Sequence, residues 1–270
     1  MIESDDKFTY GQPGQNPITS SFVTRQLYRS LSNDGYACLI LAKDTEDPLT
    51  FPEDVPHGGY VVCVCPLDTD PMSTHQTSAG TSFSIYKRKS SASLPGRYID
   101  LQQKLSEQVA AGFCIYSSAI TLTYTMGYGL FSFVMHPVAV QYFLQPTNQI
   151  MLDPVPSCVY ASRAFLKGDS PLAKSLAAFV ISKNLKTVQA GSLLVNFAML
   201  IQNGGILAAE GVHLLCEAAP LALLVEQAGG TAINDKGERI LDLSSGEDAH
   251  QTITICCGLK ESIAEIVAAM

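Results

Sequence analysis

The chain has 270 residues, of which 47% are hydrophobic and 16% are charged, so it can bury one large core or two smaller ones, and disorder is not expected. Its 17 Lys and Arg residues against 25 Asp and Glu residues give a net charge of −8, which argues against nucleic acid or an anionic membrane as a partner. No apolar stretch reaches the roughly 18–20 residues of a membrane span, and the acidic N-terminus is unlike a secretion signal. We therefore expect a cytoplasmic protein.

The first half of the chain predicts a helix followed by an extended sheet. Residues 1–18 are polar and are expected to form a loose leader. A helix is expected over residues 20–33, where Val23, Leu27 and Leu31 recur every four positions. Short apolar runs then predict strands at residues 37–41, 60–65, 81–86, 113–116, 120–126, 130–135 and 140–144.

The second half predicts three helices with marked ends. A Ser-Pro pair at Ser170 supplies an N-cap and a first-turn proline for the first. Ser192 opens a second helix that ends at Gly204, and Pro220 opens a third that ends at Gly229. Blocks of strands and helices predict an α/β layered architecture, in two tightly joined halves that meet near residue 145.

The eight cysteines lie mostly within apolar runs, where a free thiol packs as a small hydrophobic side chain. No CxxC pair is present, so no zinc site is indicated. Cys63 and Cys65 share one face of a predicted strand, which leaves a thiol pair open beside simple packing.

The strand near residue 60 carries the first indication of chemistry. It ends at Asp68, and open α/β sheets bind ligands at the carboxyl ends of their strands. The spacing of residues 65–68, Cys-Pro-Leu-Asp, resembles the Asp-Pro-Leu-Asp-Gly-Ser motif of the fructose-1,6-bisphosphatases. Further segments resemble the same family in the same order: residues 80–86, 110–116, 191–192, 204–206, 214–220, 226–230 and 250–251. The resemblance covers roughly residues 37–270.

This resemblance implies the layered αβαβα sandwich of the sugar-phosphatase type. Residues 1–145 would form the half with the metal motif, and residues 146–270 the sugar-binding half. It also implies Mg²⁺, because several carboxylates must converge to hold closely spaced hard ions around a phosphate. By match to the family motifs, the metal ligands would be Asp44, Asp68, Glu217 and the carbonyl of Leu67, and the three carboxylates would also be the catalytic residues.

The matching positions depart from the family pattern where the metal should bind. Cys65 stands in place of the first aspartate of the motif, and a thiol is a poor ligand for a hard ion. Lys43 places a positive charge where the family has an acidic residue, and Ser20 stands where it has another aspartate. The Mg²⁺ site is therefore expected to be weak or lost.

The matching phosphate and sugar positions are altered as well. The backbone cradle for phosphate corresponds to Thr69, Asp70 and Pro71, where proline has no N–H to donate and the aspartate repels an anion. Tyr160 and Gly191 match the sugar-binding side, whereas the family's arginine and lysine contacts have no counterpart. The candidate substrate-binding residues are Tyr160, Thr69, Asp70 and Gly191.

Each of these residues also has a purely structural interpretation. Asp68 and Glu217 could serve as helix caps or surface charges, Ser192 as an N-cap, and Tyr160 as packed core. The five histidines show no pairing at metal or catalytic spacing, so each is expected to be structural.

The resemblance and its departures predict a catalytically inactive or strongly impaired relative of fructose-1,6-bisphosphatase, a regulatory or structural subunit. The alternative is an active Mg²⁺-dependent phosphatase with a remodelled site that hydrolyses fructose 1,6-bisphosphate or a related ester. A third interpretation is a binding module that senses an anionic sugar without hydrolysing it. A sugar phosphate is the expected ligand, and a homotetramer or dimer, or an assembly with an active paralogue, is the expected oligomer.

Overall fold

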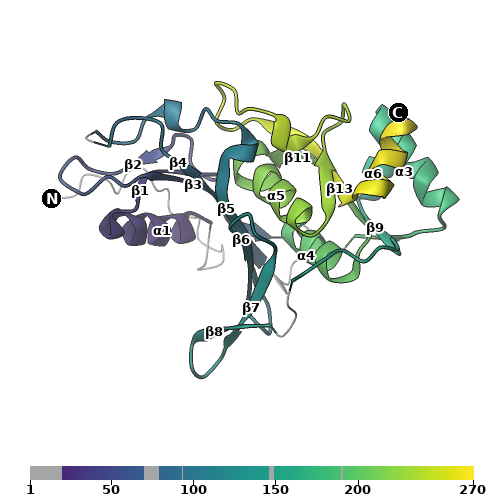
Figure 1. Cartoon of the computed structure of the whole chain (residues 1–270), viewed down its shortest axis with the longest axis horizontal. Coiled ribbons are helices and arrows are strands. Elements are labelled where there is room, and N and C mark those ends of the chain that lie inside the picture. Colours follow the sequence, from purple (N-terminus) through teal and green to yellow (C-terminus); the bar gives the residue numbers. More distant parts are fainter. Residues whose placement is uncertain (1–19, 70–78, 93, 146–148, 190) are drawn as a thin grey trace, which may run out of the picture.

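The computed structural model describes residues 20–69, 79–92, 94–145, 149–189 and 191–270. Its strands form an eight-stranded sheet in the order β2-β1-β3-β4-β5-β6-β7-β8 and a five-stranded sheet in the order β10-β9-β11-β13-β12 (Figure 1). The first sheet contains β1 Ala37–Ala42, β2 Leu49–Thr50, β3 Tyr60–Thr69, β4 Ala79–Lys87, β5 Gln108–Tyr116, β6 Thr121–Thr125, β7 Phe131–His136 and β8 Gln141–Leu144. The second contains β9 Cys158–Tyr160, β10 Lys186–Val188, β11 Ile206–His213, β12 Gly230–Ile233 and β13 Thr252–Leu259.

Helices separate and cover the two sheets. They are α1 Ser20–Asp34, α2 Arg163–Leu166, α3 Pro171–Ser182, α4 Leu193–Asn203, α5 Ala219–Gln227 and α6 Lys260–Ala268, with a π-helical turn, η4 Leu214–Ala218, directly before α5. Short 3-10 helices are η2 Tyr98–Asp100, η3 Leu105–Glu107 and η5 Ile240–Asp242. None of these helices is both long and apolar enough to cross a membrane within the described part of the chain.

Three apolar clusters define the layers. Leu27, Tyr28 and Leu31 of α1 pack against one face of β1 and β3, while α4 and α5 fill the space between the two sheets. The helices α3 and α6 cover the far face of the second sheet (Figure 1). The fold is therefore the expected αβαβα sandwich, and β1 is buried at every position because it has a helical layer on each side.

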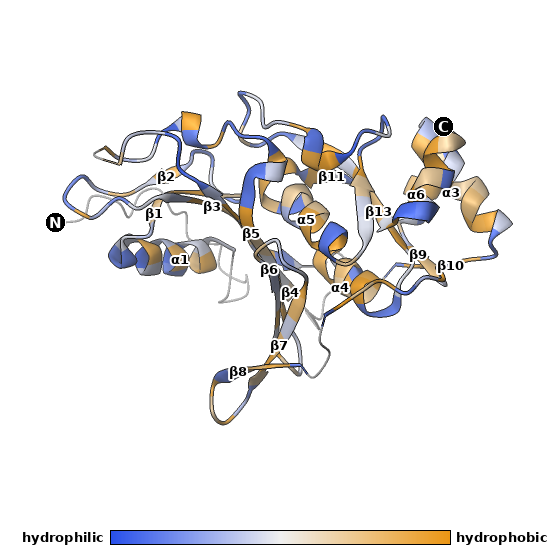
Figure 2. Cartoon of the chain, in the orientation of Figure 1, coloured by the Kyte–Doolittle hydropathy of each residue, from blue (hydrophilic) through white to orange (hydrophobic). Residues whose placement is uncertain are grey.

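Local sequence accounts for most of the elements. In Figure 2, α1 carries both hydrophilic and hydrophobic residues, as expected for a helix with one face against a sheet. The Oγ of Ser170 accepts the N–H of Ala173 at 3.1 Å, and the Oγ of Ser192 accepts that of Val195 at 3.4 Å, so both predicted N-caps are confirmed. All eight cysteines are free thiols, which confirms the packing interpretation of Cys63 and Cys65.

The predicted helices and first-sheet strands are present, although several have different ends. The strand β3 extends to Thr69 because it continues to pair with β4 beyond a register shift between Cys65 and Asp68. The strands of the second sheet, β2, α2 and α6 are not among the predicted elements. Two sheets meet across α4 and α5, so the carboxyl end of β3 lies next to the start of α4, where the candidate site is located.

Candidate functional site

Glu217 lies at the centre of the candidate site and is almost completely buried, with 1% of its surface exposed. It belongs to the π-helical turn η4, which links β11 to α5. One carboxylate oxygen, Oε2, accepts the backbone N–H of His213 at 2.9 Å. The other, Oε1, accepts a hydrogen bond from the ammonium of Lys43 at 2.7 Å. Glu217 is therefore a buried member of an ion pair and not a surface charge.

Lys43 reaches Glu217 from the end of β1. Its backbone N–H bonds to the carbonyl of Val64 at 2.9 Å, which fixes the first residue after the strand beside β3. Its side chain keeps 41% of its surface exposed. Burial opposes the charged form of Lys43, but attraction to Glu217 and, more weakly, to Asp68 outweighs it, so the pKa of Lys43 is raised. The site thus contains its own cation, paired with Glu217.

Cys65 lies against the same carboxylate. Burial raises the pKa of its thiol, and the negative charge of Glu217 and the hydrogen bond that the thiol gives to Glu217 raise it further. Cys65 is 2% exposed and stays a neutral thiol at physiological pH. It therefore offers the site a weak donor and no anionic ligand.

Asp68, at the end of β3, holds the first turn of α4. Its Oδ2 accepts the backbone N–H of Leu194 at 2.7 Å, and the side chain of Ser192 also bonds to it. Burial raises the pKa of Asp68, and the two hydrogen bonds act in the opposite direction. The carboxylate thus stabilises a helix N-terminus, where unpaired N–H groups and the helix dipole favour a negative charge.

Asp44 bonds to the N-terminal helix. The hydroxyl of Thr24, in the second turn of α1, donates to Oδ1 of Asp44 at 2.7 Å. Asp68 and Glu217 both act electrostatically on Lys43, whereas Asp44 is exposed and is not among the groups that shift the pKa of that lysine. The structure therefore brings together two of the three predicted carboxylates.

The predicted substrate-binding residues and Leu67, predicted as a metal ligand, are divided between two places. Leu67 and Thr69 are half-buried positions at the end of β3, and Asp70 and Pro71 lie outside the described residues. Tyr160 and Gly191 line a cavity of about 310 Å³ between β9, β11 and α4. Tyr160 is 2% exposed and donates its hydroxyl to the carbonyl of Met199 at 3.3 Å, and burial raises its pKa to about 12.

This cavity has no cationic lining residue in the described part of the chain. Its polar lining comes from Ser162, Gln189, Asn196 and Glu210, and Glu210 is its one charged side chain. A phosphate there would meet a carboxylate and no Lys or Arg, so it would lack the charge-assisted hydrogen bonds that usually hold phosphates.

Two histidines beside the site lie in contact, which their spacing in the sequence does not indicate. The Nε2 of His213 lies 3.0 Å from the Nδ1 of His250. The Nδ1 of His213 accepts the N–H of Cys216 at 3.2 Å, which leaves the hydrogen on Nε2 to donate to His250. Burial, with repulsion from His250, lowers the pKa of His213 to about 4. The two residues are 37 positions apart in the sequence, so no local pattern indicates the pair.

Comparison with known proteins places the fold and the site in context. The N-terminal domain of fructose-1-6-bisphosphatase matches residues 21–146, and the C-terminal domain of the same enzyme matches residues 160–270. The chain belongs to the fructose-1,6-bisphosphatase family. Relatives named fructose-1,6-bisphosphatase class 1 include one from Leptospira biflexa, 32% identical over 88% of this chain and 74% of its own. Another, from Maridesulfovibrio salexigens, is 29% identical over 91% of this chain and 77% of its own.

A solved structure has the same fold. The holo form of Leishmania major fructose-1,6-bisphosphatase superposes with a TM-score of 0.81 over 93% of this chain and 82% of its own, at 21% identity. The family resemblance seen in the sequence is therefore confirmed. It is a family of phosphoric monoester hydrolases that generally use divalent metal ions.

The residues present do not fit a divalent ion of the family's kind. A Mg²⁺ ion needs several oxygen ligands, yet the oxygens of Glu217 already accept from an ammonium and an amide. The described residues contain no group of three or more His, Cys, Asp and Glu side chains placed to hold a metal. A Mg²⁺ ion about 4 Å from the Lys43 ammonium would be repelled by roughly 8 kcal/mol at an effective dielectric constant of 20.

Proposed function

We propose that this chain is a fructose-1,6-bisphosphatase-family protein in which metal-assisted phosphate hydrolysis is absent or strongly impaired, and that it acts as a regulatory or structural subunit. The observation that carries the proposal is the 2.7 Å ion pair between Lys43 and buried Glu217. The pair neutralises the most buried carboxylate of the site, and Asp68 is engaged by α4. With Cys65 neutral, the site offers few oxygens to a hard ion.

An active Mg²⁺-dependent phosphatase acting on fructose 1,6-bisphosphate or a related ester is the second candidate, and the comparisons favour it, because the relatives carry the name of the enzyme. One structural observation also supports it. The Lys43 side chain is 41% exposed, so water competes with Glu217 for its ammonium, and a cation that displaced the ammonium would find the Glu217 carboxylate.

Phosphate release from fructose 1,6-bisphosphate and a panel of sugar monophosphates, with Mg²⁺ or Mn²⁺ and with a chelator, separates the two candidates. The first predicts no release above that of Asp68→Asn, a nearly isosteric variant that keeps an acceptor for α4. Turnover that the chelator and Asp68→Asn both abolish would establish the second. The Asp68→Asn control also excludes a contaminating phosphatase, whose activity it would leave unchanged.

The ligand and the assembly belong to the same proposal. A sugar phosphate, an assembly as homotetramer or dimer or with an active paralogue, and a cytoplasmic location stay predictions. Thermal stabilisation by a sugar phosphate without phosphate release would instead support the binding-module interpretation.

A further inference from the structure

One long segment of the chain carries no formal charge. All 17 Lys and Arg residues and all 25 Asp and Glu residues lie outside residues 108–152, where His136 is the sole histidine. This segment forms β5 to β8 and the stretch that leads toward the second sheet. A surface of this kind has no charge with which to attract a nucleic acid, a lipid headgroup or an oppositely charged protein.

The end of this segment projects from the protein as an arm, formed by β7, β8 and the turn between them (Figure 1). Every residue of β8 is exposed. Val138 and Val140 in the turn are 85% and 70% exposed, and Phe143 and Leu144 in β8 are 53% and 55% exposed. The turn at the tip is largely hydrophobic in Figure 2. An uncharged, apolar edge strand that no described element covers is a typical site of strand pairing with another chain.

The backbone of β8 leaves one edge open. As the last strand of the sheet, β8 pairs with β7 alone in the described structure. The N–H of Gln145 donates to the carbonyl of Ser132 across this pair at 2.9 Å. Hydrogen bonds alternate along an antiparallel strand, so Phe143 also bonds toward β7. The N–H and C=O groups of Tyr142 and Leu144 therefore point to the open edge.

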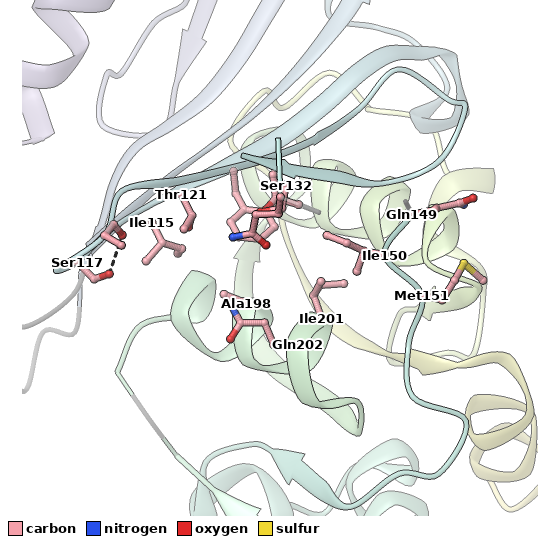
Figure 3. A pocket seen from close by; sticks show the side chains of 14 residues that line it. Ile115, Ser117, Thr121, Ser132, Gln149, Ile150, Met151, Ala198, Ile201 and Gln202 are labelled. Carbon is pink, nitrogen blue, oxygen red and sulfur yellow. Dashed lines mark hydrogen bonds between the residues drawn. The ribbon is translucent and has the colours of Figure 1, made fainter. Parts of the chain in front are cut away.

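The uncharged surface continues from the arm to the body of the protein. A cavity of about 440 Å³ lies between β5 to β7 and α4, and the described residues that line it include no Asp, Glu, Lys or Arg. Figure 3 shows Ser132 and Thr121 of the sheet on one side of this cavity, and Ala198 and Ile201 of α4 on the other.

We propose that the open edge of β8 is an interface between two copies of this chain, in which the β8 strands pair antiparallel around a two-fold axis near Phe143. A second copy brings an identical open edge, so Tyr142 of one copy can pair with Leu144 of the other and all four outward groups of each strand are satisfied. Two copies with a net charge of −8 each repel one another least where the facing segments are uncharged. This interface is independent of whether the chain hydrolyses a phosphate ester.

Sedimentation velocity of the full chain tests the interface with two pairs of variants. Phe143→Asp places like charges beside the axis, and Ile181→Asp, on α3 and 80% exposed, is its matched control. Leu144→Pro removes an outward N–H and spares the ladder with β7, whereas Leu144→Thr keeps that N–H. We expect Phe143→Asp and Leu144→Pro to weaken association at least tenfold and the two controls to associate like the wild type. A monomeric wild type at high micromolar concentration, or association unchanged in both interface variants, would overturn the proposal.

A crosslinking experiment tests the register even if a variant folds poorly. Facing residues of a non-hydrogen-bonded antiparallel pair have Cα atoms about 4.5 Å apart, within the range that a disulfide spans. Phe143→Cys should therefore form a disulfide-linked dimer under mild oxidation, which a reductant cleaves, and Ile181→Cys should not. The native thiols are present in both variants, so they do not account for a difference. Equal crosslinking of the two variants, or none in Phe143→Cys, rules the proposed pairing out.

Discussion

Replacing Lys43 by methionine removes the ammonium from the site with little change in side-chain volume. Loss of one partner from a fully buried ion pair costs about 3–5 kcal/mol. Lys43 is 41% exposed, and Glu217 keeps two other donors, the amide of His213 and the thiol of Cys65, so a smaller loss is expected. We predict that Lys43→Met lowers the free energy of unfolding at pH 7 by about 1–3 kcal/mol, measured by urea denaturation.

A surface ion pair provides the control for this variant. Lys183 lies 3.0 Å from Glu265, with both side chains about half exposed, so Lys183→Met should cost less than about 1 kcal/mol. Because the pKa of Lys43 is raised in the folded state, its contribution is present below the unfolded pKa and is lost as pH rises through the folded pKa. The difference between wild type and Lys43→Met should therefore stay level through neutral pH and decrease only in alkaline solution.

The same variant tests whether the lysine takes the place of a bound ion. Without the ammonium, Asp68 and Glu217 face no fixed cation, so Mg²⁺ at about ten times its dissociation constant should stabilise Lys43→Met by about 1.4 kcal/mol. The wild type should show no such gain. If Mg²⁺ stabilises the wild type as much as the variant, or if Lys43→Met is as stable as the wild type, the ion pair does not have the role assigned to it.

Three further substitutions test other parts of the structure. Asp68→Ala should lower the free energy of unfolding in urea by about 1–2 kcal/mol, because the hydrogen bonds to the start of α4 are lost. Asp68→Asn keeps an acceptor for those bonds, so it should lower the free energy of unfolding by less than half as much. The folded pKa of His213 is about 4, below its unfolded value of 6.5, so its contribution is present above pH 6.5 and is lost as pH falls toward 4. His213→Asn should therefore flatten the loss of stability between pH 6.5 and 5, on the order of 1–2 kcal/mol, whereas His136→Asn at an exposed position should not. Gly205→Ala should lower the free energy of unfolding by about 3 kcal/mol or more, because the new Cβ would lie 2.4 Å from the backbone carbonyl oxygen of Cys158. Gly127→Ala, also at positive φ but in open space, should lower it by about 1 kcal/mol. Thermal unfolding measures both losses, and equal losses would contradict this reasoning.

The sequence predicted elements whose signals are local. Apolar spacing and serine N-caps located α1, α3 and α4, and short apolar runs located the strands of the first sheet except the two-residue β2. The strand β11 was missed because it mixes small residues with Glu210 and Gly211 and has a register shift there. The strand β13 carries a β-branched run at its start that could have indicated it.

The site depended on contacts that no local pattern shows. Lys43 and Glu217 are 174 positions apart, and their pairing follows from how the end of β1 meets the turn before α5. The family resemblance placed Lys43 at a ligand position, but it did not indicate which carboxylate the ammonium would meet. Asp44 was expected among the ligands, and its bond to Thr24 depends on where α1 lies against the sheet.

The position of Asp68 has a consequence for how such chains evolve. Because this carboxylate anchors the beginning of a helix between the two sheets, losing it would damage folding even in a descendant that no longer turns over any substrate. Natural selection for a stable fold can therefore maintain the aspartate long after chemistry has ceased. Surveys that count active enzymes by the presence of this one side chain would then include proteins that retain it for purely architectural reasons.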